Sequence, residues 1–342
     1  MKKIILVFLT ISINLTIKAQ DGMEAILLSG VSDANKLTEA YINPSMKGLI
    51  YSMNGGWYHT AKTHQTLGFD ISIGLNASVI PSSEEIFNFS DLGLSSNTTS
   101  TSLTGATVAG PNSLEAPVKV STTINGQNVT ANYTMPGGVK DDLPLNAMPA
   151  PSVQLTLGLP HNFDIMLRGV PSVGSNDVKG NLLGVGVKKE ITSLFGPIDK
   201  LPLHVSLLGT YTTMDVNYDL QNDSSIQGVN QEATFNLNAY SVQAIASINF
   251  PIINFYGGIG YSGGSSKFKM KGTYNLEYNT GYPAPNDTAE VTVTDPINLN
   301  FDTKALKTTL GTRISLGFFK LFADYTLQEY NTITAGIAFS FR

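Results

Sequence analysis

The segment QTLGFDISIGLNASVI, residues 65–80, decides the fold class, because apolar and polar residues alternate along it from Leu67 to Val79. Its odd positions carry mostly large apolar side chains, and its even positions carry small or polar ones such as Asp70. Successive side chains of a β-strand point to opposite faces, so this strand has one apolar face and one polar face. We expect an apolar phase to cover the first face.

The same alternation recurs along most of the chain. Many of the segments keep it for about ten residues, which is the length a tilted strand needs to cross a bilayer. The apolar parity changes once, between Ala239 and Tyr240, where we predict a β-bulge. The predicted strands cover 49–60, 66–80, 151–159, 163–170, 179–189, 202–217, 234–249, 253–275, 304–316, 319–328 and 331–341.

Short and long connections between these strands tend to alternate, as they do in outer-membrane barrels. Backbone groups within a membrane must all be paired, so such strands can cross it only as a closed barrel. The sequence therefore predicts an all-β protein, a closed antiparallel transmembrane β-barrel. Eleven strands are predicted, but single-chain bacterial barrels have an even number, so we expect one missed strand and about twelve in total, within a range of roughly ten to fourteen.

The N-terminal region divides into two parts. Residues 1–19 have two lysines followed by a short apolar run and a small residue at the end, which is typical of a secretory signal peptide. Residues 20–48 repeat apolar side chains every three or four positions, which predicts an amphipathic helix that ends before Pro44 and plugs the barrel. The predicted plug residues are Met23, Leu27, Val31, Leu37, Tyr41, Asn43 and Pro44. The barrel is expected over 49–342, with a large external loop at 81–150.

Charged residues on the polar parity are expected to face the lumen, because Arg or Lys facing lipid at mid-depth would cost about 2–4 kcal/mol. They either hold wall and plug together or line a path for a substrate. The lumen candidates are Asp70, Asp164, Arg168, Lys188, Lys307, Arg313, Lys320 and Asp324. An interfacial aromatic girdle is predicted from Tyr51, Trp57, Tyr211, Tyr261 and Tyr325.

The final stretch NTITAGIAFSFR, residues 331–342, ends on Phe339 and Phe341. Aromatic residues at this parity form the terminal pattern that the barrel-assembly machinery reads, so we predict an assembly signal here. We also predict that this strand closes the barrel against 49–60.

The sequence gives little support for nucleic-acid binding, disulfides, metal sites or catalysis. The formal net charge of −5 makes nucleic acid an unsuitable partner, and the absence of cysteine excludes disulfides. Asp215, Asn217 and Asp219 have calcium-loop spacing, but the loop lacks the required glycine and the final glutamate. The four histidines have no metal-binding spacing. No catalytic, cofactor or metal site is predicted, and an enzyme is not expected.

Several motifs carry a family resemblance. The order of AYINPSMKG (40–48), NGGWYHTAKTHQTLGFDISIG (54–74), LGVGVKKEI (183–191) and an aromatic C-terminal strand resembles an uncharacterised family of Bacteroidetes outer-membrane proteins. The helix followed by Asn43–Pro44 resembles the long-chain fatty-acid transporter superfamily, whose plug carries Asn-Pro-Ala where this chain has Ser45. That second resemblance implies uptake of hydrophobic compounds through the barrel wall.

We therefore expect a monomer in the bacterial outer membrane that acts as a channel or transporter for small molecules, with hydrophobic compounds among the candidates. Its expected partners are outer-membrane lipid, the barrel-assembly machinery and a small hydrophobic ligand. The alternative is a non-transporting scaffold that binds a secretion or surface-assembly partner through its loops.

Overall fold

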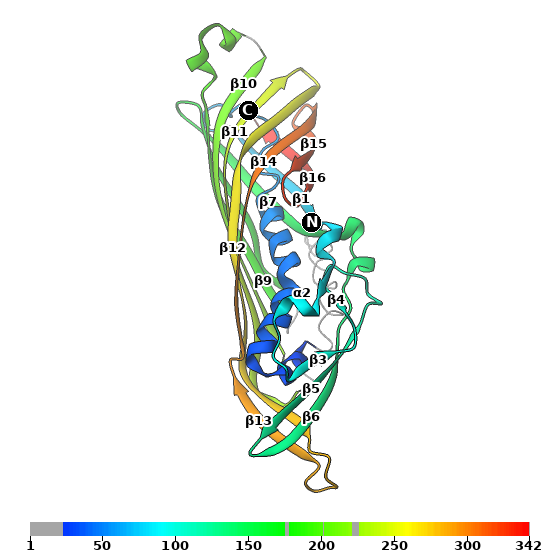
Figure 1. Ribbon diagram of the computed structural model, residues 1–342. Coiled ribbons are helices and arrows are strands. Elements are labelled where there is room, and N and C mark those ends of the chain that lie inside the picture. Colours follow the sequence, from blue (N-terminus) through cyan, green and yellow to red (C-terminus); the bar gives the residue numbers. More distant parts are fainter. Residues whose placement is uncertain (1–22, 175–177, 201, 221–225, 342) are drawn as a thin grey trace.

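The computed structural model describes residues 23–174, 178–200, 202–220 and 226–341 (Figure 1). The predicted signal peptide, residues 1–19, lies outside these ranges. Among the helices of the described ranges, none has the combination of length and hydropathy that crossing a membrane requires.

Ten antiparallel strands of the described chain form a closed ring, in which β16 pairs back onto β1 and β11 pairs with β12. The all-β barrel is therefore confirmed, and its even strand number lies within the expected range. The ring consists of β1 (Phe69–Val79), β7 (Ala147–Leu159), β8 (Phe163–Gly174), β9 (Val178–Glu190), β10 (Leu203–Asp219), β11 (Gly228–Asn249), β12 (Ile253–Asn279), β14 (Ile297–Leu316), β15 (Phe319–Leu327) and β16 (Thr332–Phe341).

The first predicted strand, 49–60, is not a strand, so the predicted number of ring strands was one too high, and among the described residues no other strand takes its place in the ring. The 3₁₀ helix η1 (Glu24–Ser29) leads into helix α2 (Gly30–Met53), which continues through Pro44 and past the predicted end of the plug at 48. An irregular segment, 54–68, then leads to β1. Pro44 removes one helical N–H, but α2 is packed inside the barrel on both sides of it, and tertiary packing overrides the local preference.

The loop predicted at 81–150 is a folded cover that ends where β7 begins. The β5–β6 hairpin turns at Asn125–Gly126, both with positive φ, and β6 reaches β12 through the pair Thr130 and Asn279. Outside the cover, β13 (Thr288–Thr294) pairs with the outer part of β12. The elements of the cover are η2 (Ser82–Glu84), β2 (Ile86–Asn88), η3 (Phe89–Leu92), β3 (Thr98–Ser100), β4 (Thr104–Ala106), β5 (Ala116–Ile124), β6 (Gln127–Met135), η4 (Lys140–Asp142) and η5 (Pro144–Asn146). In Figure 1 the cover lies over the lower part of α2.

The two ends of the barrel differ. Three tight turns, at 160–162, 250–252 and 317–318, lie at one end together with η6 (Thr192–Lys200), the start of β1 and the end of β16. The cover and the β13 extension lie at the other end (Figure 1). Outer-membrane barrels have tight turns at the periplasmic end and long loops at the external end, so the first end is here called periplasmic and the second external.

The side-chain chemistry of the wall inverts along the taller strands. On β12 the outward positions are apolar at Phe255, Ile259 and Tyr261, and lysines occupy them from Lys267 to Lys271. The inward positions change in the opposite sense, from Asn254 and Ser262 to large apolar side chains such as Phe268. The strand therefore leaves the apolar phase beyond Tyr261 and covers an apolar interior outside the membrane.

The same inversion accounts for the parity change at 239–240, where the predicted bulge was wrong. The β10–β11 register runs without interruption through Thr212 with Ala239 and Tyr211 with Tyr240. Ala239 is buried inside, whereas Tyr240 is exposed on the outer wall. The strand stays regular, and what changes is the environment on each side of it.

Candidate functional site

The lumen candidates lie on the wall around the irregular segment 54–68. Six of the eight are at most 7 % exposed inside the barrel: Asp70, Asp164, Arg168, Lys188, Lys307 and Asp324. Arg313 is partly buried and donates to His59, whereas Lys320 donates only to the Gly317 carbonyl at a periplasmic turn. Buried charges of this kind persist only when they are paired or hydrogen-bonded.

Arg168 anchors the start of the irregular segment 54–68 to the wall. Its Nη1 donates to the backbone carbonyl oxygens of Met53 (3.2 Å) and Gly55 (2.9 Å), and its Nε and Nη2 donate to Gln154 Oε1 at 3.2 and 3.0 Å. The guanidinium stacks on Trp57, with Cζ 3.9 Å from the ring centroid. A planar guanidinium can donate and stack at once, which a lysine cannot do.

Two histidines fasten the middle of the segment through wall carboxylates. His59 Nε2 lies 3.1 Å from Asp70 Oδ2, and the Arg313 guanidinium donates to His59 Nδ1 at 3.1 Å. Because Nδ1 accepts, Nε2 carries the proton and donates to Asp70. His64 Nε2 lies 3.2 Å from the same Asp70 oxygen, and His64 Nδ1 lies 3.2 Å from Asp164 Oδ2.

Two lysines of the wall complete the attachment. Lys188 Nζ lies 2.9 Å from Asp164 Oδ2 and also donates to the carbonyl oxygens of Thr60 (3.4 Å) and Lys62 (3.0 Å). Lys307 donates to the Asn54 carbonyl oxygen at 3.0 Å. Wall side chains thus hold residues 53–64, here called the polar seal, along its length, and the seal crosses the axis of the barrel.

An apolar interior, here called the outer core, lies on the external side of the polar seal. Buried side chains of η1 and α2 pack there against the inner faces of the cover and of the outer parts of β12 and β14. Its largest members are Leu37, Tyr41, Tyr133, Phe268, Met270, Tyr274, Leu276, Tyr278, Leu299 and Phe301. The lumen is therefore polar near the periplasm and apolar toward the exterior.

Two neighbouring strands of the ring, β7 and β8, stop pairing before either strand ends. Pairing of β7 with β8 runs from Leu159 and Phe163 to Gln154 and Arg168 and then stops, although β7 still pairs with β1 as far as Ala147. The facing parts, 147–153 and 169–174, are here called the β7–β8 seam. Continuing the register by three residues would place Pro151 opposite Pro171. Neither has an N–H to donate, so the sequence itself prevents the ladder from continuing there.

The interior behind the seam is apolar. Ala150 of β7 and Val170 of β8 are buried in one cluster with Ile50 and Met53 of α2. Leu155 and Leu167 are exposed on the outer wall next to the seam. Apolar side chains therefore lie on both faces of the wall near the seam, inside at Ala150 and Val170 and outside at Leu155 and Leu167.

An external network anchors α2 to the loops. Lys47 lies 3.2 Å from Glu329 and 3.5 Å from Glu84, and the Tyr51 hydroxyl donates to Glu329 at 2.6 Å. Tyr330 donates to Glu84 at 2.5 Å. Burial, together with this bond to Glu84, raises the pKa of Tyr330, so the hydroxyl stays protonated and donates.

The predicted plug and assembly residues are distributed as follows. Leu37 and Tyr41 are almost completely buried in the outer core, whereas Val31 is 47 % exposed. The Phe341 ring stacks on Phe69 of β1 with centroids 5.1 Å apart, and Phe339 lies opposite Ile71. Barrel closure thus uses β1, and the predicted closure against 49–60 was wrong because 49–53 belong to α2.

The aromatic girdle is only partly as predicted. Tyr211, Tyr261 and Tyr325 are exposed on the outer wall, but Trp57 and Tyr51 are buried inside. Sequence reasoning also missed the seal histidines, because His59 and His64 show no metal or catalytic spacing. The inward carboxylates Asp70 and Asp164 could have pointed to them, because a buried carboxylate needs a hydrogen-bond donor inside the barrel.

The described residues contain no cluster of three His, Cys, Asp or Glu side chains that could hold a metal ion. Asp215 of the calcium-like spacing accepts a hydrogen bond from Asn236 at 2.6 Å on the outer wall.

The chain matches the model of the "Family of unknown function (DUF6588)" over residues 1–341, and it belongs to this family. No curated protein sequence gives a significant match.

Several solved structures show low similarity. The translocator domain of autotransporter NalP from Neisseria meningitidis is 10 % identical at a TM-score of 0.31, over 82 % of this chain and 90 % of that one. The outer membrane protease OmpT from Escherichia coli is 10 % identical at a TM-score of 0.29, over 82 % and 100 %. Ail, the attachment invasion locus protein of Yersinia pestis, is 10 % identical at a TM-score of 0.27, over 81 % and 100 %. The fold of this chain rests on its own strand pairing.

Proposed function

We propose that this member of the family is an outer-membrane transporter of small hydrophobic molecules, which leave the barrel sideways through the β7–β8 seam. A catalytic role forms no part of the proposal. The observation that carries it is the seam itself, since it leaves two strand edges of the ring unpaired, and a spanning barrel otherwise pairs its backbone groups from strand to strand.

The chemistry of the lumen supports a sideways route. Straight passage to the periplasm would have to break the bonds of the polar seal, among them those of Arg168, Asp164 and Lys307. An apolar compound gains nothing from that polar region, because it cannot replace the hydrogen bonds. The outer core offers it apolar contacts instead, and the cluster of Ile50, Met53, Ala150 and Val170 continues these contacts to the seam.

The exterior supports location in a membrane. Leu306, Val242 and Ile259 are more than 60 % exposed on the outer wall between the periplasmic turns and the tyrosines. From Tyr240 to Ile248 the outward residues of β11 span about nine positions, which matches a tilted membrane strand of about 9–11 residues. The resemblance of the N-terminal region to the long-chain fatty-acid transporter superfamily points to the same class of cargo.

The test links the two edges of the seam. The chain has no cysteine, so Val153→Cys with Gly169→Cys introduces the only reactive pair, to be joined by a short bismaleimide. The readout is the initial rate at which intact cells expressing the protein take up a pyrene-labelled C12 fatty acid. We expect the cross-link to lower this rate several-fold.

The matched control is Leu167→Cys with Val185→Cys, two residues that already pair between β8 and β9. Joining them should leave uptake unchanged. Mass spectrometry would verify that the seam is fully cross-linked. If uptake were then unchanged, the molecules would not leave the barrel through the seam.

The alternative function, a non-transporting scaffold, is favoured by one observation: side chains of the wall bind the polar seal along its length. Under that alternative, a stoichiometric partner should co-purify through the folded cover, and the labelled fatty acid should enter cells no faster than in cells lacking the protein.

A further inference from the structure

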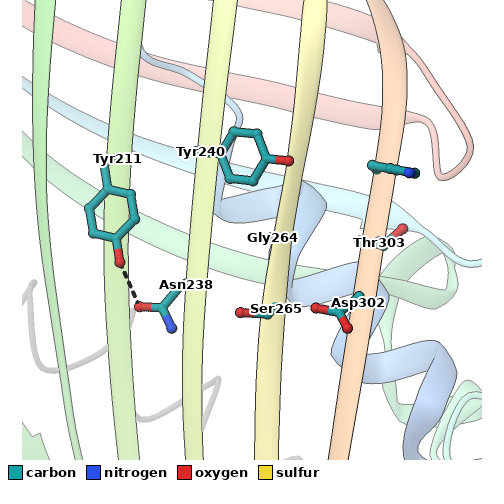
Figure 2. A pocket seen from close by; sticks show the side chains of 8 residues that line it. Tyr211, Asn238, Tyr240, Gly264, Ser265, Asp302 and Thr303 are labelled. Carbon is teal, nitrogen blue, oxygen red and sulfur yellow. Dashed lines mark hydrogen bonds between the residues drawn. The ribbon is translucent and has the colours of Figure 1, made fainter.

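A shallow pocket of about 440 Å³ lies on the outside of the barrel, where the apolar band ends (Figure 2). It spans four adjacent strands, β10, β11, β12 and β14. Its lining residues are Tyr211, Asn238, Tyr240, Gly264, Ser265, Asp302, Thr303 and Lys304.

Strand register explains why the pocket is there. Two neighbouring cross-strand rows form it: Tyr211, Tyr240, Gly263 and Lys304 in one row, and Thr213, Asn238, Ser265 and Asp302 in the next. Between the tyrosines and the β14 side chains, β12 contributes only glycine and serine. A Cβ at Gly263 would lie 2.9 Å from the Tyr240 hydroxyl, so the glycine lets the Tyr240 side chain lie across β12 at the edge of the hollow.

The lining suits a sugar ring. Figure 2 shows the Tyr211 and Tyr240 rings beside the hollow and the Asp302 carboxylate on its other side. The Tyr211 hydroxyl donates to Asn238 Oδ1 at 3.0 Å, which leaves the Asn238 amide hydrogens available as donors. Aromatic faces with a few fixed polar groups are typical of sites that bind polar ligands having an apolar face.

A row of lysines begins two residues farther along β12. Lys267, Lys269 and Lys271 all point outward, and Lys267 is flanked by Asn236 and Asn300 on the adjacent strands. Lys271 lies 3.5 Å from Glu232. Among the described residues, no carboxylate lies within 4.0 Å of Lys267 or Lys269. Since a strand rises about 3.3 Å per residue, Lys267 is about 7 Å from Ser265, within reach of one headgroup.

The wall below the pocket is strongly apolar. Leu306 of β14 is 79 % exposed and Val242 of β11 is 65 % exposed. Acyl chains would lie here, a sugar would lie at the tyrosines, and an anionic group would lie at the lysines. All three belong to one molecule only if it is an amphiphile that carries a phosphorylated sugar at its head.

We propose that this pocket and the adjacent lysines bind the phosphorylated sugar headgroup of an outer-leaflet glycolipid. The inference rests on the outer-membrane location in the proposed function but not on transport. Lysine ammonium groups bind the phosphates as point charges, and Asn238 and Asp302 bind the hydroxyls. The site holds the barrel at a fixed depth, with the lipid against β11, β12 and β14, on a face of the barrel other than that of the seam.

The test is native mass spectrometry of the full-length mature protein in detergent, titrated with bis-phosphorylated lipid A. We expect Lys267→Ala with Lys269→Ala, and separately Ser265→Trp, which fills the hollow, to lower the bound fraction several-fold. The control for charge is Lys119→Ala with Lys179→Ala, which removes two exposed lysines on other strands. It should bind lipid A as the unchanged protein does.

Two further ligands test the phosphate groups and the sugar of the headgroup separately. Dephosphorylated lipid A should lose most of the binding, and phosphatidylglycerol, which has a phosphate but no sugar, should bind more weakly than lipid A. Equal binding of lipid A by all variants, or equal binding of phosphatidylglycerol and lipid A by the unchanged protein, would overturn the proposal. Neither result depends on fatty-acid uptake, so failure of this site and failure of transport are distinguishable.

Discussion

Arg168 is a buried cation whose hydrogen-bond partners in the described chain are neutral: Gln154 and two backbone carbonyl groups. Removing it leaves these acceptors without donors and one face of Trp57 without contact. We expect Arg168→Ala to lower the free energy of unfolding by about 1–3 kcal/mol for the lost donors, measured by urea titration in detergent. Arg168→Lys should recover only part of this loss, because an ammonium cannot reproduce the fork geometry.

Lys320→Ala is the control for this prediction, since Lys320 bonds only the Gly317 carbonyl oxygen at a turn. It should change stability little. If Arg168→Ala and Lys320→Ala were equally stable, the polar seal would not depend on Arg168.

At the residue level, the direction of wall side chains was predictable, and their partners were not. A period of two fixes the face, which is why the alternation placed Asp70, Asp164 and Arg168 inward. What each of them binds depends on where the irregular segment lies in space. Trp57, Tyr58 and His59 follow one another in the sequence with no period that distinguishes the polar seal from a strand.

At the level of elements, α2 shows why the first predicted strand was wrong. Leu49, Ile50, Tyr51 and Met53 are apolar at nearly successive positions. The wall surrounds α2 on several sides, and Ile50, Tyr51 and Met53 are all buried. A helix that is packed all around carries no clear period of 3.6 residues. Pro44 then suggested an end to the helix that packing inside the barrel prevents.

The last strand supports a prediction about assembly. Truncation after Ala338 removes the pairs Phe339 with Ile71 and Phe341 with Phe69, including the stacked rings. We expect the truncated chain to fail to fold in the membrane and to lose heat-modifiable migration on unboiled gels, because β1 would face an incomplete partner. Deleting Arg342 alone is the control and should leave migration unchanged. Normal migration of the truncated chain would contradict this function of the tail.

At the scale of the whole molecule, the barrel combines two interiors within one wall. The tall strands β10, β11, β12 and β14 invert their chemistry near Tyr240 and Tyr261, so the part within the membrane is polar inside and the part beyond it is apolar inside. Sequence reasoning detected the inversion at 239–240 but attributed it to a local bulge. Only the three-dimensional packing of α2 and the cover shows that the same strand serves two environments.

The central claim is that residues 53–64 seal the lumen, and single-channel conductance in planar bilayers tests it most directly. Deleting 24–42 removes η1 and half of α2 but leaves the polar seal bonded to the wall, so conductance should stay near that of the unchanged protein. Deleting 24–64 removes the seal as well and should open a stable conducting pore, provided the variant still migrates as a folded barrel. A folded 24–64 deletion that conducts no better than the unchanged protein would contradict the claim.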